Sequence, residues 1–387
     1  MNLMNRKNMQ LLSGNHAVSW AARLCRPDVA PLYPITPQTP ILEKITEFHA
    51  EGLMKTELLT PESEHSAMAA CISASLTGAR VFTATSSQGL LLQHELLHYA
   101  TGARAAIVMC NVNRTPASPW GFWPDQLDSL SQRDTGWVQF YSESPQESLD
   151  SVIMAFAIAE SVGVPTMVCH DAFYVSHSME PVEIPDQAMV DDFLPKFDPA
   201  RKLDTAVGAS FGAPLDQNTW RRSRMDLAES LAAVTDETIR VGEAWGKLTG
   251  RSYGPLERYR CDDAEMVIVT MGSMCGTVRD AVDTMRENGK RVGLLKVRQF
   301  RPLPASMLRD ALAGVPVVMV LDRNYSPGTG GILHQELKAV LSGMADGPKV
   351  HGLLAGIGGA NVSSETIDRW VRDYQNAEPK PESQWVE

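Results

Sequence analysis

Tyr33-Pro34-Ile35-Thr36-Pro37 is a rigid, proline-bracketed loop that follows the short apolar run 30–33. Pro61-Glu62-Ser63-Glu64-His65 places acids at the start of a segment rich in small residues, and Asn113-Arg114-Thr115-Pro116 puts a lone arginine after a second apolar run. Loops that follow the strands of an α/β sheet gather at one edge, where such folds keep their sites. Together these loops offer a hydroxyl, a carboxylate and a guanidinium, which suit cofactor activation and the binding of an anionic substrate.

Around these loops, strand-like and helix-like segments alternate through residues 1–172. The apolar runs that predict strands are 30–33, 80–85, 105–110, 137–141 and 165–170. The helical patterns between them are 16–24, 40–49, 64–77, 89–101 and 145–162. This alternation predicts an α/β domain with a parallel sheet and helices on both faces.

The alternation breaks after residue 172 and returns near residue 263. Residues 173–262 predict a linker that is first extended, because it is rich in proline and acids, and then helical at 218–234 and 236–248, packing over the first domain. Residues 263–375 predict a second α/β domain. The polar tail 376–387 is expected to be frayed or to lie on a partner.

Bulk composition excludes several classes of protein. The 387 residues carry a net charge of −11 without basic runs, which argues against a nucleic-acid surface. No apolar run reaches the length of a membrane span, and the N-terminus lacks the features of a signal peptide, so we expect a cytoplasmic protein. The six cysteines form no CxxC pair, so we expect neither an iron–sulfur cluster nor a structural zinc in this chain.

Several short strings, taken in their order and spacing, point to a known family. They are Tyr33 to Pro37 (YPITP), Ser63 to Ala67 (SEHSA), Ser86 to Leu90 (SSQGL), Asn113-Arg114, Asp125 to Trp137 (DQLDSLSQRDTGW), Met271 to Ser273 (MGS), Leu295 to Arg298 (LKVR), Arg301-Pro302 and Leu321 to Arg323 (LDR). This set resembles the alpha subunit of the 2-oxoacid:ferredoxin oxidoreductases, typified by pyruvate:ferredoxin oxidoreductase (pyruvate synthase). The resemblance runs from about Gly14 to Tyr374.

The resemblance implies a fold and an activity. The first domain would be the pyrimidine-binding domain of a thiamine-diphosphate enzyme, and the second would resemble the C-terminal domain of transketolase. The implied activity is the oxidative decarboxylation of a 2-oxoacid, with coenzyme A as co-substrate and electrons passed to ferredoxin. The family's partners are a beta subunit that binds thiamine diphosphate, a gamma subunit and a ferredoxin-like delta subunit that carries iron–sulfur clusters.

The chain lacks the GDG string with a downstream asparagine that binds the diphosphate and its Mg2+. The resemblance therefore implies that the cofactor is shared with the beta subunit, which would hold the metal. Two other functions stay open. One is a complex of the same family that acts on a bulky or aromatic 2-oxoacid, such as phenylglyoxylate, and passes electrons to NAD through a flavin subunit. The other is a non-oxidative, transketolase-like thiamine enzyme.

Glu64 is the catalytic candidate. An acid in the first turn of a helix commonly does no more than compensate the helix dipole. By its place in SEHSA, however, Glu64 matches the family glutamate that bonds the aminopyrimidine ring and favours its imino tautomer. Glu62 matches less well.

Arg114 and Thr36 are the substrate-binding candidates. Arginine is suited to bind a carboxylate with two parallel hydrogen bonds, although an arginine after a strand is often a surface cation. The resemblance implies that Arg114 holds the 2-oxoacid carboxylate and that Thr36 hydrogen-bonds the substrate; a simple turn bond is the alternative for Thr36. Pro34 would shape the wall beside the cofactor.

Trp120-Gly121-Phe122-Trp123 departs from the smaller residues usual for the family. Core packing is one explanation, and a pocket for a bulky 2-oxoacid, lined by Phe122 and Trp123, is the other. His94 and His98 imitate part of a zinc-protease string, but without a third ligand we expect no metal site. The glycines at 328–331 and 356–359 predict tight turns, because they do not fit a dinucleotide fingerprint.

Overall fold

The apolar runs of the first domain form the core strands of a seven-stranded sheet in the computed structural model, which describes residues 8–386. In sheet order these strands are β12 (Gln299–Arg301), β6 (Val138–Ser142), β7 (Thr166–Asp171), β5 (Ile107–Asn113), β4 (Val81–Thr85), β2 (Val29–Pro31) and β3 (Glu57–Leu59). All neighbours pair in parallel except β12, which is antiparallel to β6. The central strands are buried on both faces, which explains their almost unbroken apolar sequences.

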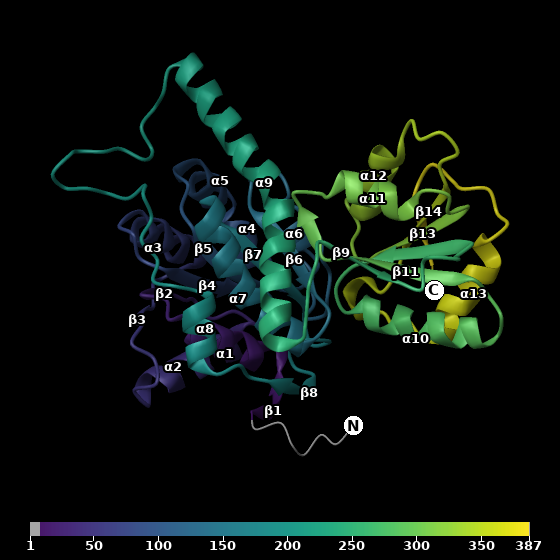
Figure 1. The fold of residues 1–387 in the computed structure, drawn as a ribbon, viewed down its shortest axis with the longest axis horizontal. Coiled ribbons are helices and arrows are strands. Elements are labelled where there is room, and N and C mark those ends of the chain that lie inside the picture. Colours follow the sequence, from purple (N-terminus) through teal and green to yellow (C-terminus); the bar gives the residue numbers. More distant parts are fainter. Residues whose placement is uncertain (1–7, 387) are drawn as a thin grey trace.

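Helices cover both faces of this sheet (Figure 1). One face packs on α1 (Gly14–Cys25), α2 (Thr39–Ala50) and α7 (Pro145–Val162), and the other on α3 (Glu64–Leu76), α4 (Ser87–Leu92), α5 (His94–Ala103) and α6 (Leu127–Leu130). The start of α7 is well specified, because Ser144 caps it and Pro145 occupies its first turn. The predicted parallel sheet with helices on both faces is confirmed.

The second domain is built on a six-stranded sheet. Its strands, in sheet order, are β15 (Gln384–Trp385), β14 (Lys349–Leu354), β13 (Val317–Asp322), β10 (Met266–Thr270), β11 (Val292–Val297) and β9 (Leu256–Tyr259). On one face lie α10 (Met274–Glu287) and α13 (Ser364–Tyr374), and on the other α11 (Ala305–Leu312) and α12 (Ile332–Leu341). A short 3-10 turn, η2 (Ile357–Gly359), follows β14.

The segment between the domains contains more structure than its sequence predicts. It holds β8 (Met179–Glu183), which pairs antiparallel with β1 (Met9–Ser13), then α8 (Gln187–Phe193), and then the single 33-residue helix α9 (Gln217–Thr249). α9 is one helix where two were expected. Its C-terminal part packs on the first domain through Leu227, Val234, Val241 and Trp245.

Two expectations about the chain's ends and boundaries need correction. The tail is not frayed throughout, because β15 pairs with the buried strand β14 and Ser383 hydrogen-bonds Gly331. The second sheet also begins before residue 263, because β9 pairs with β11. β9 and β15 are strands of only four and two residues that mix polar and apolar side chains, so their sequences carry no clear strand pattern.

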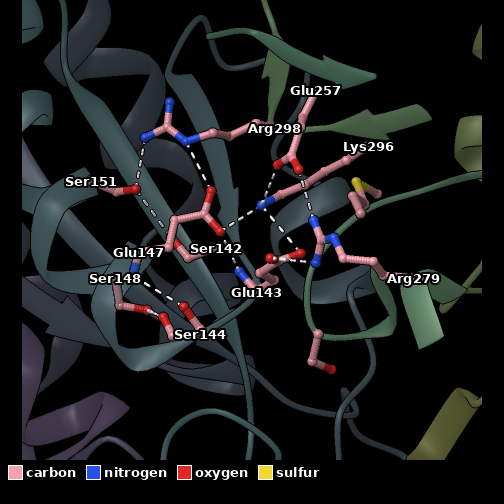
Figure 2. A network of polar contacts seen from close by, with 12 residues as sticks. Ser142, Glu143, Ser144, Glu147, Ser148, Ser151, Glu257, Arg279, Lys296 and Arg298 are labelled. Atoms are coloured by element: carbon pink, nitrogen blue, oxygen red, sulfur yellow. Dashed lines mark hydrogen bonds and ion pairs between the residues drawn. The ribbon is translucent and has the colours of Figure 1, made fainter. Parts of the chain in front are cut away.

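A buried network of charges joins the two domains (Figure 2). Glu147, in the first turn of α7, accepts hydrogen bonds from Lys296 Nζ at 2.7 Å and from Arg298 Nε at 3.0 Å. All three side chains are almost fully buried. Since Lys296 lies on β11 and Arg298 follows it, these ion pairs fix the second domain against the first.

Candidate active site

The three loops singled out from the sequence lie at the carboxyl edge of the first sheet. The loop 32–38 follows β2, the Glu64 segment follows β3, and Arg114 follows β5. Between them, β4 is followed by Ser86 and by Ser87, the first residue of α4. Because β3, β2, β4 and β5 are consecutive parallel neighbours, their loops lie side by side.

Arg114 is the centre of this edge. Its side chain is 4% exposed, and burial lowers its pKa from the ordinary value. Nη1 donates to the backbone carbonyl of Thr36, and Nη2 donates to the side-chain oxygen of Gln88. A guanidinium has five N–H groups, and the buried Nε of Arg114 has no partner among the described residues. Arg114 therefore keeps donors for an anion while its position is fixed.

Asp128, at the start of α6, organises the backbone around Arg114. Its carboxylate accepts from the backbone N–H groups of Ser87 at 2.9 Å and of Arg114 at 3.2 Å. The side chains of Asn111 and Asn113 donate to it at 3.1 Å and 2.6 Å. Burial raises the pKa of Asp128 to about 6, although these hydrogen bonds act in the opposite direction. This fully buried carboxylate therefore ties together the ends of β4 and β5.

Glu64 is half-buried and points toward α4. A Cβ atom built on Gly89 would lie 2.7 Å from Glu64 Oε1 and 2.6 Å from Thr85 Oγ1, so only glycine fits against the two side chains. The hydroxyl of Thr85 is buried and has no partner among the described residues, and the side-chain oxygen of Gln93 is in the same state. Gln93 also donates to the backbone carbonyl of Glu64 at 3.1 Å. Both atoms lie beside Glu64 and are available to hydrogen-bond a ligand there.

Glu62, the weaker candidate, has a different environment. Its carboxylate is exposed and accepts a 2.5 Å hydrogen bond from the hydroxyl of Ser66, which lowers its pKa. Ser63 caps α3, so the helix does not need a glutamate as its cap.

The other predicted residues of this edge are accessible. Pro34 and Thr36 are exposed in the loop after β2. Phe122 and Trp123 are 46% and 49% exposed, so neither side chain is a core residue. Trp120 covers Arg114, with its ring centroid 4.9 Å from the guanidinium carbon. We call residues 120–123 the aromatic loop. The hydroxyl of Thr115 donates to the carbonyl of Gly121 at 2.7 Å and so ties this loop to the segment that follows β5.

The aromatic loop also contacts the second domain. The ring of Trp123 packs on the ring of Phe173. Trp123 also lies close to Gly359 of the second domain: a Cβ atom built on Gly359 would be 2.6 Å from the Cβ of Trp123. Below it, Arg323 Nη1 donates to Asp171 Oδ2 at 2.9 Å. The hydroxyl of Ser273 donates to the same oxygen at 2.6 Å. The second domain therefore supports the loop that carries Phe122 and Trp123.

The remaining sequence features have structural explanations. The glycines at 328–331 form a turn closed by Ser326 and Gly330 ahead of α12, as predicted. His94 Nδ1 lies 2.6 Å from the side-chain oxygen of Gln132. Within residues 8–386, no group of three His, Cys, Asp or Glu side chains could hold a metal ion, and none of the described helices is long and apolar enough to cross a bilayer.

Gln88 and Asp128 are site residues that pattern reasoning did not select. Both lie inside the strings that resemble the family, but an amide or an acid next to serines forms no spacing pattern that indicates a functional site. Their role depends on the approach of β4, β5 and α6, which only the folded chain shows.

Comparisons with known proteins give a consistent result. The family model described as "Pyruvate flavodoxin/ferredoxin oxidoreductase, thiamine diP-bdg" matches residues 20–238, and "Pyruvate:ferredoxin oxidoreductase core domain II" matches residues 264–367. The pyruvate synthase subunit PorA of Methanothermobacter thermautotrophicus is 44% identical, over 96% of this chain and 96% of its own length. The ketoisovalerate oxidoreductase subunit VorA of Pyrococcus horikoshii is 46% identical, over 95% of this chain and 93% of its own.

Two solved structures share the fold. A 2-oxoglutarate:ferredoxin oxidoreductase from Magnetococcus marinus, with 2-oxoglutarate, coenzyme A and succinyl-CoA bound, gives a TM-score of 0.73 at 19% identity, over 96% of this chain and 66% of that chain. A split-gene transketolase, an inactive beta4 tetramer, gives a TM-score of 0.53 at 11% identity, over 94% of this chain and 98% of that chain. At these identities the two structures show the fold alone.

Proposed function

This chain belongs to the pyruvate flavodoxin/ferredoxin oxidoreductase family, and on that premise we propose that it is the alpha subunit of a thiamine-diphosphate-dependent 2-oxoacid oxidoreductase complex. The complex would decarboxylate a 2-oxoacid, transfer the acyl group to coenzyme A and pass the electrons to ferredoxin. The family resemblance and the fold class inferred from the sequence are confirmed.

The observation that carries the proposal is the meeting of Arg114, Thr36 and Glu64 at one sheet edge. Arg114 would bind the substrate carboxylate through the N–H groups that Thr36 and Gln88 leave free. The exposed hydroxyl of Thr36 would bind another substrate oxygen. Both contacts orient a 2-oxoacid at the same place, which lowers the entropic part of the barrier.

The residues around Glu64 fit a bound thiamine diphosphate. Glu64 would hold the aminopyrimidine ring, Pro34 would form part of the wall beside it, and the unpaired Thr85 hydroxyl and Gln93 oxygen offer polar partners in the same cradle. When bound, this cofactor accepts the electron pair released by decarboxylation. Glu64 supplies a carboxylate that exchanges a proton with the ring and so sets its tautomer.

The proposal requires partner chains. A beta subunit would anchor the diphosphate and Mg2+, because this chain lacks the motif for both. Gamma and ferredoxin-like delta subunits would carry the electrons, since the six cysteines of this chain are widely spaced and form no CxxC pair of the kind that binds iron–sulfur clusters. Coenzyme A would be a co-substrate that reaches the active site in the assembled complex.

The exposed aromatic loop favours a second candidate, the same chemistry on a bulky or aromatic 2-oxoacid with electrons passed to NAD through a flavin subunit. Phe122 and Trp123 would line the wider pocket. The test is to purify the native complex and measure coenzyme A-dependent oxidation of pyruvate, 2-oxoisovalerate and phenylglyoxylate with ferredoxin and with NAD. Activity that needs neither coenzyme A nor an electron acceptor, in a preparation without iron–sulfur subunits, would favour the transketolase-like alternative instead.

A further inference from the structure

Gln88 is the one residue of a buried segment whose side chain reaches the open edge of the first sheet. The segment 81–90 comprises β4, Ser86 and the start of α4, and all of its residues are buried except Gln88, which is half-buried. An amide side chain carries two N–H donors and one acceptor oxygen. Gln88 can therefore bind a ligand and a protein group at the same time.

The backbone at Ser87 fixes where Gln88 points. Ser87 has a φ of 45°, in the left-handed region that residues other than glycine rarely adopt. Its N–H donates to the Asp128 carboxylate at 2.9 Å, and its hydroxyl donates to the Thr115 carbonyl at 2.7 Å. Backbone of this kind persists only where the surrounding contacts hold it, and it is concentrated at functional sites. These two bonds therefore hold the turn that presents Gln88 to the edge of the sheet.

The contacts of Gln88 decide which of its amide atoms remains available. Arg114 Nη2 donates to Gln88 Oε1, and the Ser87 hydroxyl also hydrogen-bonds this oxygen. A guanidinium has no acceptor, so the amide atom that meets it must be the oxygen. Nε2 lies on the other side of the amide carbon, is not buried, and makes no hydrogen bond within residues 8–386. Gln88 thus presents two N–H donors at the open edge.

Gln88 lies between the two groups proposed to hold substrate and cofactor. On one side Arg114 contacts its oxygen. On the other side the next residue, Gly89, packs so closely on Glu64 that a Cβ atom built on it would be 2.7 Å from Glu64 Oε1. In a 2-oxoacid the keto carbon is bonded directly to the carboxyl carbon, so the keto oxygen lies beside the carboxylate. A carboxylate held by Arg114 therefore brings the keto oxygen next to Gln88.

We propose that Gln88 is a further substrate-binding residue, whose Nε2 donates a hydrogen bond to the keto oxygen of the 2-oxoacid. This inference rests on the proposed function. Negative charge develops on the keto oxygen when the keto carbon is attacked, and a fixed N–H donor stabilises that charge most in the transition state. The same side chain holds Arg114 through its oxygen, so it aligns the donors for the carboxylate with the donor for the neighbouring oxygen.

Gln88→Met tests the contact, because methionine has a similar length but has no N–H donor and only a weak acceptor. The probes are oxamate, which has the carboxylate and adjacent carbonyl of a 2-oxoacid, and propionate, which has the carboxylate alone. Their inhibition constants are measured against 2-oxoacid oxidation by the native complex. In Gln88→Met the ratio of the oxamate constant to the propionate constant should rise roughly tenfold, because only oxamate loses a hydrogen bond to Nε2. The control is Gln217→Met, at the exposed start of α9, which should change neither constant.

An equal rise in both constants would show that Gln88 only holds Arg114 in place, and it would overturn the proposal. So would two unchanged constants. An inhibition constant reports only the complexes that bind, so a partly misfolded Gln88→Met preparation cannot imitate the change in ratio. An active wild type with a constant ratio in the variant would remove the Gln88 contact alone. A wild-type complex that oxidises no 2-oxoacid would instead refute the proposed function, and this inference with it.

Discussion

Arg114 is held to Thr36 through the backbone: its Nη1 donates to the Thr36 carbonyl oxygen, so this bond does not use the threonine hydroxyl. The two residues selected as substrate ligands are therefore in contact before any substrate is present. The guanidinium of Arg114 is held by the loop that contains Thr36, while Thr36 itself is exposed at the edge of the sheet. Preorganisation of this kind lowers the cost of ordering side chains when a ligand binds.

Arg114→Ala should mainly raise the KM for the 2-oxoacid, by roughly 10- to 100-fold, because the variant cannot form the charge-assisted pair of hydrogen bonds. Arg114→Lys should recover part of the loss, since it keeps the charge but not the planar fork. Steady-state kinetics of the native complex measure both. An unchanged KM in the alanine variant would place the carboxylate site elsewhere.

Glu64→Gln should lower kcat roughly 100-fold or more, because the amide cannot exchange the proton that sets the cofactor's tautomer. The matched control is Glu62→Gln, two residues away on the exposed side of the same segment, which should retain near-normal turnover. Thiamine content of the two purified complexes separates a failure of proton transfer from a failure of cofactor binding. Near-normal turnover in Glu64→Gln would refute its catalytic role.

Phe122→Ala and Trp123→Ala should change which substrate the complex prefers. If these rings line the pocket, the ratio of kcat/KM for phenylglyoxylate to that for pyruvate should fall roughly tenfold, because only the aromatic substrate packs against them. Trp220→Ala removes a comparably exposed tryptophan from the first turn of α9 and is the control. A constant ratio in all three variants would mean that the loop only packs against the second domain.

Much of the fold follows from the sequence because the parallel strands are buried and their apolar runs are almost unbroken. The strands β9 and β15 could not be predicted, since they have only four and two residues and acquire strand structure by pairing with their neighbours. Thr36 and Arg114 stood out because their loops follow predicted strands, and Glu64 stood out by its place in the string SEHSA, since the strand β3 before it was not predicted. Gln88 and Asp128 did not, because their importance comes from hydrogen bonds between elements distant in the chain.

Asp125→Asn should alter how stability depends on pH. Burial raises the pKa of Asp125 to about 7, and the nearby Asp128 acts in the same direction. The folded protein therefore binds a proton that the unfolded chain, with an aspartate pKa near 3.9, has released. The stabilisation is complete below the unfolded pKa and is lost as the pH rises through 7.

Relative to wild type, Asp125→Asn should thus be more stable at pH 7 than at pH 5 by roughly 2 kcal/mol, since each unit of pKa difference corresponds to about 1.4 kcal/mol. The amide can still accept the hydrogen bond from the Leu127 backbone N–H, so the local turn should persist. Urea unfolding of both proteins at pH 5, 6, 7 and 8 measures the difference. Parallel curves would show that this carboxyl does not titrate in that range.

The buried network between the domains should be far more sensitive to substitution than the exposed ion pairs. Glu147→Gln removes the charge that Lys296 and Arg298 share. Lys296 keeps Glu143 and Glu257 at 3.3 Å and 3.7 Å, whereas Arg298 stays buried and loses the carboxylate it pairs with. Leaving a buried charge uncompensated costs roughly 3–5 kcal/mol. Because the two cations belong to the second domain, the substitution should separate the unfolding of the domains, which calorimetry would resolve as two transitions.

The control is Glu237→Gln, whose partner Arg240 is largely exposed. This variant should leave a single transition near the wild-type temperature. Equal behaviour of the two variants would show that hydrophobic contacts alone hold the domains together.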